Sequence, residues 1–253
     1  MKRKIFINPD FKNFEAFVEN IPESFRSEEN FIRRGRNEIK IVNVDGTDLV
    51  VKYFKRITLA NRLIYATIRK SKAQRAYEHS EKINRKGFKS PEPVAYIDVY
   101  RRGTLDMSFY VSLYTDYKPI VPLFYLPIDK AEAAIKSFAR YTFRLHRAGI
   151  FHGDYNMGNV LYSFNGSDYD YSLIDNNRMR FSKYSYNKGI RNIGKLNMPV
   201  NAIGIFVTEY ANAARSEEIR TLGKIIMSIM RDKIRHNVKA SFKKLIKFIC
   251  HPR

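Results

Sequence analysis

A short segment of the chain, GIFHGDYNMGNVLY at 149–162, gathers residue types that can do chemistry. Asp154 and Asn159 are separated by four residues within it, and a second carboxylate, Asp175, follows in the segment YSLIDNNR. Apolar residues stand on both sides of the polar positions, which is typical of short buried strands joined by a loop. A plain surface loop explains this pattern less well.

The chemistry that suits these three side chains is phosphoryl transfer. Asp154 can accept the proton of an attacking hydroxyl, while the oxygens of Asn159 and Asp175 can hold Mg²⁺ against the phosphates of a nucleotide. Proteins catalyse this reaction mainly by positioning the reactants and by neutralising charge. Asp175 taken alone is more often a turn former, so only the three residues together indicate this chemistry.

The elements that must position this segment are predicted from the spacing of apolar residues. A long helix over 128–149 leads into it and ends at Gly149. One face of this helix is apolar and carries Ala134, Phe138, Tyr141 and Leu145. Two short strands around the turn NGSD at 165–168 follow, and the chain from about 201 is predicted to be helical and basic.

The first half of the chain is predicted to be mostly antiparallel sheet. Its strands are expected over 38–44, 48–55, 94–100 and 108–117. The hairpin turn DGT joins the first two strands, and a polar helix over 71–86 ends at Gly87. The prolines of KPIVPLFYLP then break regular structure, so a boundary between two lobes is expected near residue 118.

The composition limits the possible classes of protein. The chain has 253 residues, 44% of them hydrophobic, which is enough for one two-lobed domain or two small domains. Its single cysteine, Cys250, excludes a disulfide framework and a zinc site built on cysteines. The apolar run near the start is too short for a signal peptide, and no window is long enough for a membrane-spanning helix. A cytoplasmic protein is therefore expected.

The charge of the chain is its unusual feature, because 46 Lys and Arg against 25 Asp and Glu give a net charge of +21. Such an excess attracts polyanions, whether nucleic acid, anionic lipid head groups or phosphorylated sugars. The charge alone does not choose among these partners. For most single lysines, a basic surface that only keeps the protein soluble is the alternative.

The segment LHRAGIFHGDYNMGNVLY, followed by LID, resembles the catalytic and metal-binding segments of the protein-kinase-like superfamily. Gly153 stands in place of Arg, and Asn176 and Asn177 stand in place of Phe and Gly. The segments IDNNRMRF, RGRNEIKIVNVDGTDLVVKYFK and SPEPVAYI are similar to the lipopolysaccharide kinase family, which phosphorylates Kdo or heptose of the inner core. The H-G-D form also resembles some small atypical protein kinases. The likeness covers residues 30–215, most of the chain.

The resemblance implies an α+β, two-lobed protein-kinase-like fold. Residues 1–117 would form a small antiparallel β lobe with one main helix, which binds the nucleotide, and residues 118–253 a mostly helical catalytic lobe. Asp154 would be the catalytic base, with Asn159 and Asp175 as the magnesium ligands. His152 would support the catalytic loop without carrying a proton.

The resemblance also implies how ATP is held. Lys52 would contact the nucleotide phosphates and would itself be held by Glu78, with Glu81, one turn further on, as the competitor for that pairing. The loop RRGRNE would cover the phosphates through residues that include Gly35, Arg36 and Asn37. A solvated strand Lys and a solvated helix face remain the alternatives for Lys52 and Glu78.

Several segments depart from the kinase pattern or compete with it. The loop over the phosphates has only one glycine, and no A-P-E segment follows Asp175, which favours a non-protein acceptor. The segment GIRNIGKL at 189–196 matches a Walker A loop except that Leu196 stands where Ser or Thr must bind Mg²⁺, so it is interpreted as a basic loop near the active cleft. The last segment, HNVKASFKKLIKFIC, is predicted to be a basic amphipathic helix that packs on the protein or lies on an anionic membrane.

The sequence therefore predicts a cytoplasmic kinase that uses ATP and Mg²⁺, peripheral at the inner membrane. Its expected acceptor is a sugar hydroxyl of the lipopolysaccharide inner core, Kdo before heptose, free or lipid-linked. The anionic surface of the inner membrane is its other expected partner, and no nucleic acid is expected. The alternatives are an atypical Ser/Thr protein kinase and a non-catalytic kinase-like module that binds anionic lipid or nucleic acid.

Overall fold

The computed structural model describes residues 1–25, 31–33, 35, 37–55, 69–231 and 234. Two compact units are formed. The first unit consists of Met1–Lys118 and Tyr171–Met179, and the second of Pro119–Asp170 and the chain from Arg180 onward. The chain thus leaves the first unit, returns to it for nine residues, and leaves it again.

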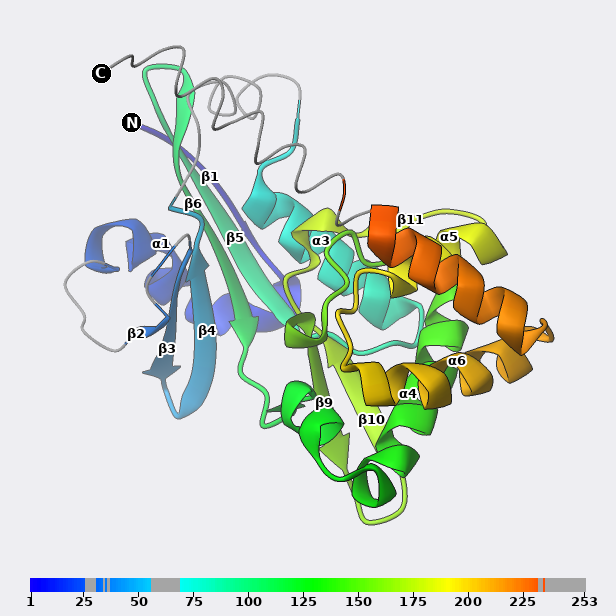
Figure 1. Ribbon diagram of the computed structural model, residues 1–253. Helices are drawn as coiled ribbons and strands as arrows, with labels where there is room; N and C mark the ends of the chain where they lie inside the picture. Colours follow the sequence, from blue (N-terminus) through cyan, green and yellow to red (C-terminus); the bar gives the residue numbers. More distant parts are fainter. Residues whose placement is uncertain (26–30, 34, 36, 56–68, 232–233, 235–253) are drawn as a thin grey trace, which may run out of the picture. The chain divides into compact units, whose positions relative to one another are not determined.

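The first unit is built on an antiparallel sheet in which the described strands follow the order β1-β5-β6-β4-β3-β2 (Figure 1). These strands are β1 (Lys2–Ile7), β2 (Phe31–Arg33), β3 (Glu38–Val44), β4 (Thr47–Tyr53), β5 (Pro93–Arg101) and β6 (Thr104–Leu113). The 3-10 helix η1 (Pro9–Phe14) and helix α1 (Glu15–Ser24) contribute to the core on one face of the sheet. Helix α3 (Lys72–Arg85) contributes to the core on the other face.

Strand β4 shows how the sheet separates these two cores. Leu49, Val51 and Tyr53 are buried in the core that includes α1. Phe54, just beyond the strand, is instead buried with α3 residues and Tyr96. Because side chains alternate between the faces of a strand, Lys52 lies on the α3 face of the sheet. This face is the one on which the site residues of the first unit are found.

The predicted hairpin over 38–55 is confirmed in its strands and in its turn. Val44 pairs with Thr47, and Asp45 and Gly46 between them have φ angles of 50° and 79°, the signs required by a type I′ turn. A second turn of the same kind, at 102–103, joins β5 to β6. This turn starts β6 at Thr104, four residues before the strand that the sequence predicts.

Helix α3 confirms the polar helix predicted over 71–86. Ser71 caps its start, because the Ser71 hydroxyl oxygen accepts a hydrogen bond from the backbone N–H of Gln74 at 2.9 Å. Gly87 follows its end with a φ of 77°, a conformation that favours glycine. The buried face of α3 is formed by small and aromatic residues, Ala73, Ala76, Tyr77, Ser80 and Ile83.

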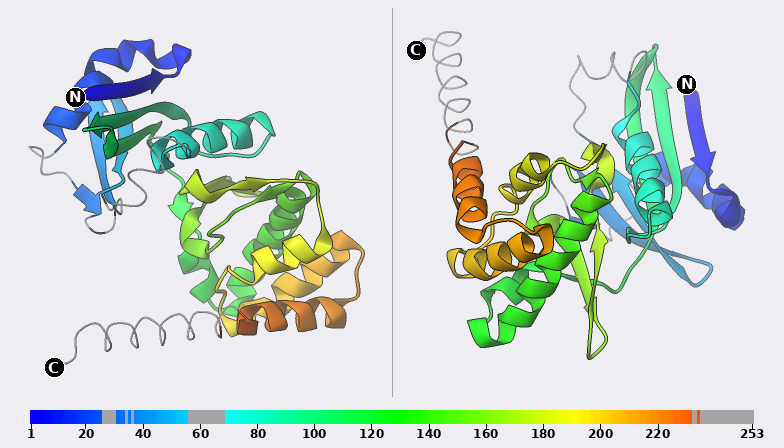
Figure 2. Two further views of the ribbon diagram at one scale, coloured as in Figure 1. Left: turned by 90° about the horizontal axis from the view of Figure 1, so that it is seen from above. Right: turned by 90° about the vertical axis from the view of Figure 1, so that its right-hand side faces the viewer.

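The second unit is mostly helical. Helices α4 (Ile128–Arg147) and α6 (Val200–Ala214) lie side by side in both views of Figure 2. The predicted apolar face of α4 is confirmed, since Ala134, Phe138, Tyr141 and Leu145 are all buried. Other elements that lie wholly in this unit are η2 (Val121–Tyr125), β8 (Ile150–Phe151), η3 (Met157–Asn159), β9 (Val160–Phe164), β11 (Arg180–Phe181), α5 (Tyr186–Ile193) and a helix over 218–231.

Three shorter elements lie near the points where the chain passes from one unit to the other. Strands β7 (Lys118–Pro119) and β10 (Tyr169–Leu173) cross from one unit to the other, and the 3-10 helix η4 (Asn176–Arg178) belongs to the first unit. The turn predicted at 165–168 joins β9 to β10, and the Asn165 side-chain oxygen accepts hydrogen bonds from the backbone of Ser167 and Asp168. Within the described residues, no helix is both long enough and apolar enough to span a membrane.

Gly149 follows the end of α4 and starts the segment 149–162 that carries Asp154 and Asn159. Its φ is 74°, and a Cβ atom there would lie 2.3 Å from the Ser182 carbonyl oxygen. The Ser182 backbone N–H also donates to the Gly149 carbonyl oxygen at 2.9 Å, beside the pairing of β8 with β11. A glycine is therefore needed here for two reasons, its backbone conformation and the close approach of a neighbouring chain segment.

Candidate active site

The first unit brings Lys52 and Asp175 together although 123 positions separate them in the sequence. The Lys52 ammonium donates to the Asp175 carboxylate over 2.7 Å. The Lys52 side chain is only 13% exposed and that of Asp175 is 30% exposed, so the pair is partly shielded from water. A lysine in this setting is not the solvated edge residue that was the alternative for Lys52.

Asp175 is held in an unusual backbone conformation. Its φ and ψ are 58° and 44°, the left-handed region, which a non-glycine residue occupies at some cost and which is common at functional sites. The Asn177 side-chain amide donates to the same carboxylate oxygen that accepts from Lys52. Two donors thus fix the direction of one Asp175 oxygen.

Asn176, which stands in place of Phe in the kinase pattern, makes polar contacts in the first unit. Its side-chain amide is buried and donates to the hydroxyl oxygens of Ser80 and Ser90 and to the carbonyl oxygen of Leu173. His79 of α3 contacts the Asn176 carbonyl oxygen through Nδ1 at 2.7 Å. Because that oxygen can only accept, Nδ1 of His79 carries the proton. Asparagine therefore attaches the Asp175 turn to α3 by hydrogen bonds.

The predicted pairing of Lys52 with Glu78 is not among the contacts of the described residues. The Glu78 carboxylate accepts instead from the Lys70 ammonium at 2.8 Å and from Gln74 at 2.9 Å. Burial acts to raise the pKa of Glu78, but these hydrogen bonds help to lower it below its ordinary value. Glu81 pairs with Arg85 one turn along α3. The role of Glu78 in holding Lys52 stays a prediction.

The predicted phosphate-binding loop is described only in part. Gly35 and Asn37 lie in the bend that leads into β3, and a Cβ atom on Gly35 would meet nothing within 4 Å. Arg36 lies outside the described residues. The roles of these three residues toward a nucleotide stay predictions.

The second unit carries Asp154 on a loop that is secured by its neighbours. His152 is fully buried, and its Nδ1 accepts a hydrogen bond from the Asp154 backbone N–H at 3.1 Å. The Asn159 side-chain amide donates to the Asp154 backbone carbonyl oxygen at 2.8 Å. Asp154 itself is exposed. His152 therefore occupies the supporting position that the sequence predicted, with Nδ1 as an acceptor.

A chain of buried hydrogen bonds continues from this loop into the second unit. The Asn192 side-chain amide of α5 donates to the His152 carbonyl oxygen at 2.7 Å, and the Asn192 oxygen contacts His146 Nε2 at 3.1 Å. His146 Nδ1 contacts the Tyr210 hydroxyl at 2.9 Å. With Asn192 donating its NH₂ group to the loop, His146 Nε2 must donate to the Asn192 oxygen, and Nδ1 accepts from Tyr210.

His146 is neutral in this chain of hydrogen bonds. It is fully buried between α4, α5 and α6, and burial lowers its pKa to about 4. Gly189 of α5 makes room for the arrangement, because a Cβ atom there would lie 2.5 Å from the Tyr210 hydroxyl and 3.0 Å from His146 Nδ1. This chain of hydrogen bonds therefore requires the glycine at position 189 as well as its polar members.

The two predicted magnesium ligands lie in different units, Asn159 in the second and Asp175 in the first. Both offer oxygen atoms, which is the donor type that Mg²⁺ prefers. The Asn159 NH₂ group donates to the loop backbone, so its amide oxygen is the atom available to a cation. In the part of the chain that the structure describes, no cluster of three or more His, Cys, Asp or Glu side chains could hold a metal ion.

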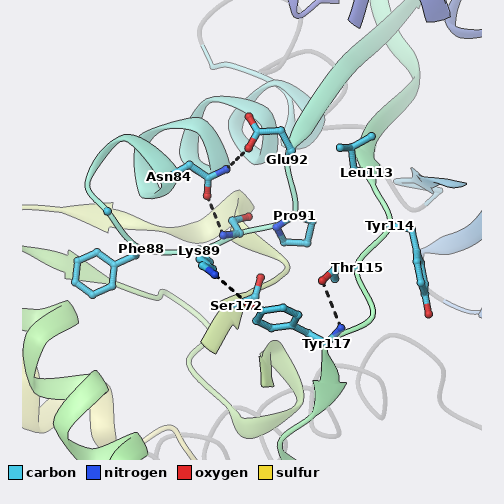
Figure 3. Close-up of a pocket in the computed structure, with 12 residues that line it drawn as sticks. Asn84, Phe88, Lys89, Pro91, Glu92, Leu113, Tyr114, Thr115, Tyr117 and Ser172 are labelled. Carbon is cyan, nitrogen blue, oxygen red and sulfur yellow. Dashed lines mark hydrogen bonds between the residues drawn. The ribbon is translucent and has the colours of Figure 1, made fainter. Parts of the chain in front are cut away.

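A cavity of about 520 Å³ in the first unit is lined by none of the predicted site residues (Figure 3). It lies beside the end of α3, where the Asn84 side chain donates to the Glu92 carboxylate and accepts from the Ser90 backbone N–H. On its other side the Lys89 ammonium donates to the Tyr117 hydroxyl at 3.1 Å. These contacts close the loop after α3 and give no reason to assign a ligand.

Comparisons with known proteins find similar structures but no similar sequences. No family model matches the chain, and no curated protein matches it. A structure of WaaP in complex with acyl carrier protein has a TM-score of 0.62 at 15% identity and covers 91% of this chain and 98% of that chain. The chain has a protein-kinase-like fold.

Two protein kinases also match the chain, with TM-scores below 0.5. A Rio2 kinase–ADP/Mg²⁺-phosphoaspartate complex from Chaetomium thermophilum has a TM-score of 0.45 at 17% identity and covers 81% of this chain and 60% of that chain. The MAP kinase LmaMPK10 from Leishmania major has a TM-score of 0.42 at 13% identity and covers 84% of this chain and 66% of that chain. The predicted α+β class and protein-kinase-like fold are confirmed by the elements of the chain and by the WaaP match.

Two buried residues behind the Asp154 loop, Asn192 and His146, are not predicted from the sequence. Asn192 was overlooked because it lies inside the Walker-like segment at 189–196, which forms part of helix α5 and its end where a basic loop was expected. His146 lies in the motif LHRAG and was treated as part of a helix end. One signal was present, because His and Asn are uncommon on the buried face of an amphipathic helix.

Proposed function

We propose that the protein is a cytoplasmic kinase that transfers a phosphoryl group from ATP, with Mg²⁺, to a sugar hydroxyl of the lipopolysaccharide inner core, Kdo before heptose. The observation that carries the proposal is the partly buried Lys52–Asp175 ion pair, formed in a kinase-like fold by two residues that the sequence motifs had singled out separately. Asp154, on a loop held by hydrogen bonds to His152 and Asn159, supplies the carboxylate that acts as the base.

Each residue has a definite task in this proposal. The Asp154 carboxylate accepts the proton of the attacking sugar hydroxyl. The Lys52 ammonium neutralises phosphate charge, and Asp175 and Asn159 would hold Mg²⁺, which would supply further positive charge toward the phosphates. His152 and Asn192 keep the Asp154 loop in place: His152 Nδ1 accepts from the Asp154 backbone N–H, and the Asn192 side-chain amide donates to the His152 carbonyl oxygen.

The nature of the acceptor is supported by charge and by the sequence. A net charge of +21 suits an acceptor that carries carboxylates and phosphates at the anionic inner-membrane surface. The absence of an A-P-E segment after Asp175 favours a sugar over a peptide. The C-terminal segment that was predicted to be a basic amphipathic helix lies outside the described residues, so its contact with the membrane stays a prediction.

The experiment that tests the function is an assay with radiolabelled ATP on a panel of acceptors. The panel contains lipid A precursors that bear Kdo, precursors that also bear heptose, and free Kdo, with casein and the protein itself as protein acceptors. We expect label in the Kdo-bearing lipids. Label in casein alone would favour the atypical protein kinase, and no transfer to any acceptor despite Mg-ATP binding would leave the non-catalytic module.

A further inference from the structure

A second cavity lies wholly within the second unit and is strongly basic. Its volume is about 710 Å³, within the range of small-molecule sites. The cationic side chains that line it are Arg180, Lys188, Arg191, Lys195 and Arg231. The described lining contains no Asp or Glu, so within its wall the positive charge is not balanced.

The cavity adjoins the loop that carries Asp154. His152 and Gly153, the two residues before Asp154, form part of its wall. The Lys195 ammonium donates to the Gly153 carbonyl oxygen at 3.1 Å and so ties the wall to the loop. Asn192, which holds the His152 carbonyl oxygen, lines the cavity as well. A molecule in this cavity therefore contacts the backbone immediately before the predicted catalytic base.

The cations differ in how they are used by the fold. Lys195 supports the loop, and Lys188 donates to the Ser182 hydroxyl at 3.1 Å. Arg180 and Arg191 are exposed. Arg191 Nε donates to the Asn187 carbonyl oxygen of its own helix. The terminal nitrogens of a guanidinium form a planar fork that matches carboxylate and phosphate oxygens.

We propose that this basic cavity binds an oxyanion, phosphate or carboxylate, that the acceptor already carries, and so selects anionic acceptors. The proposal rests on the proposed function, because it concerns the acceptor of the same site. Arg180 and Arg191 are assigned as the specificity-determining residues. Neither is placed in the phosphoryl-transfer machinery. The Walker-like segment thus acquires a role, since Arg191, Asn192 and Lys195 all belong to it.

The test measures binding of simple anions by calorimetry, on the full chain, without nucleotide. The probes are inorganic phosphate and free Kdo, with neutral glucose as the control ligand. The variant is Arg180→Gln/Arg191→Gln, and the matched control is Arg144→Gln/Arg220→Gln, which removes the same charge from two exposed positions outside the cavity. Lys188→Gln is the second cavity variant, with one charge removed.

We expect at least one anionic probe to bind the unaltered protein and glucose not to bind. The Arg180→Gln/Arg191→Gln variant should bind that probe at least roughly tenfold more weakly, the size expected when charge-assisted hydrogen bonds are lost. The Arg144→Gln/Arg220→Gln control should bind as the unaltered protein does, because both positions lie outside the cavity. The probe that binds more tightly identifies the group as phosphate or carboxylate.

Two results would overturn the inference: no binding of either anion, or equal weakening in the cavity variant and the control. Its failure is distinct from failure of the kinase proposal. Anion binding that depends on Arg180 and Arg191, together with no phosphoryl transfer, would retain the anion site and reject the kinase. Transfer to Kdo lipids with an unchanged acceptor KM in the cavity variant would retain the kinase and reject the anion site.

Discussion

Asp175 in the first unit and Asp154 in the second are the two carboxylates that the sequence predicts to be functional, yet the protein holds them differently. Asp175 is fixed through its side chain, which accepts from Lys52 and Asn177 and is partly shielded. Asp154 is fixed through its backbone, which contacts His152 and Asn159, and the residue is exposed. In the first arrangement the carboxylate itself takes part in an ion pair, whereas in the second His152 and Asn159 contact backbone atoms of the predicted base.

This difference determines what substitutions should do. A change at Asp154 removes the carboxylate but leaves the backbone hydrogen bonds to His152 and Asn159 in place. A change at Lys52 or Asp175 removes one partner of a partly buried pair, so it should affect stability as well as chemistry. Stability measurements alongside activity can therefore separate the two regions.

The largest effect is expected for Asp154→Asn. Turnover should fall by about 10²–10⁴-fold, the usual contribution of a general base, while the free energy of unfolding stays within about 0.5 kcal/mol of the unaltered protein. Steady-state assay and urea unfolding measure the two quantities. Asp168→Asn, at an exposed turn of the same unit, is the control and should change neither. Full activity in Asp154→Asn would end the kinase proposal.

The next effect is that of Lys52→Met. Turnover should fall by roughly 10²–10³-fold, because an apolar side chain cannot neutralise phosphate charge. The variant should also lose about 1 kcal/mol of stability, since Asp175 loses its ion-pair partner. Lys55→Met is the control, because Lys55 is exposed and pairs with Glu38 near the same strand. If Lys52→Met and Lys55→Met behaved alike, the Lys52–Asp175 pair would have no special role.

Much of the fold could be predicted because its signals are local. The strand over 38–44, the turn after it and the apolar face of α4 follow from alternation, from Asp-Gly and from a 3.6-residue period. The N-terminal β1, η1 and α1 were not predicted. Strand β1 reads as a charged, mostly exposed segment, and it is a strand because it pairs along β5, some ninety residues away. Such pairing depends on tertiary context, which overrides local propensity.

The site divides in the same way. The motif around Asp154 could be recognised because its residues are close in sequence and its geometry is made by nearby backbone. The contacts of Lys52 with Asp175 and of Asn192 with His152 could not be predicted, because the partners lie 123 and 40 positions apart in the sequence. The resemblance implied Glu78 as the partner of Lys52, with Glu81 as its competitor, but spacing along the chain cannot decide among several carboxylates.

The buried His146, with its hydrogen bonds in the second unit, should make the stability of the protein depend on pH. His146 has a pKa of about 4 in the folded protein and 6.5 as its ordinary value. Below pH 6.5 the unfolded chain binds a proton that the folded protein does not, so stability falls as the pH drops from about 6.5 to about 4, by roughly 3 kcal/mol in full. Urea unfolding at pH 7 and pH 5 should show a smaller loss in His146→Gln. Equal losses in the two proteins would contradict the buried, neutral His146.

A smaller effect is expected from filling the space beside Gly189 that the hydrogen bond between His146 and Tyr210 requires. Gly189→Ala places a methyl group against the Tyr210 hydroxyl and His146, and should cost about 1–3 kcal/mol as other overpacked sites do. Gly204→Ala is the matched control, because this glycine is also helical and its Cβ would meet nothing within 4 Å. The control should stabilise the protein by about 0.5–1 kcal/mol. Thermal unfolding of both variants checks the pair, and a stabilised Gly189→Ala would show that this hydrogen bond can shift.

The smallest effect distinguishes the two glutamates of α3. Both are ion-paired at the surface, Glu78 with Lys70 and Glu81 with Arg85, and such exposed pairs contribute little to stability. Neither Glu78→Gln nor Glu81→Gln should therefore shift the midpoint of unfolding appreciably. If Glu78 holds Lys52 during turnover, Glu78→Gln alone should lower the rate several-fold, as a milder form of Lys52→Met. A rate loss confined to Glu81→Gln would move the partner of Lys52 one turn along α3, and a loss in neither variant would mean that Asp175 is the carboxylate that positions Lys52.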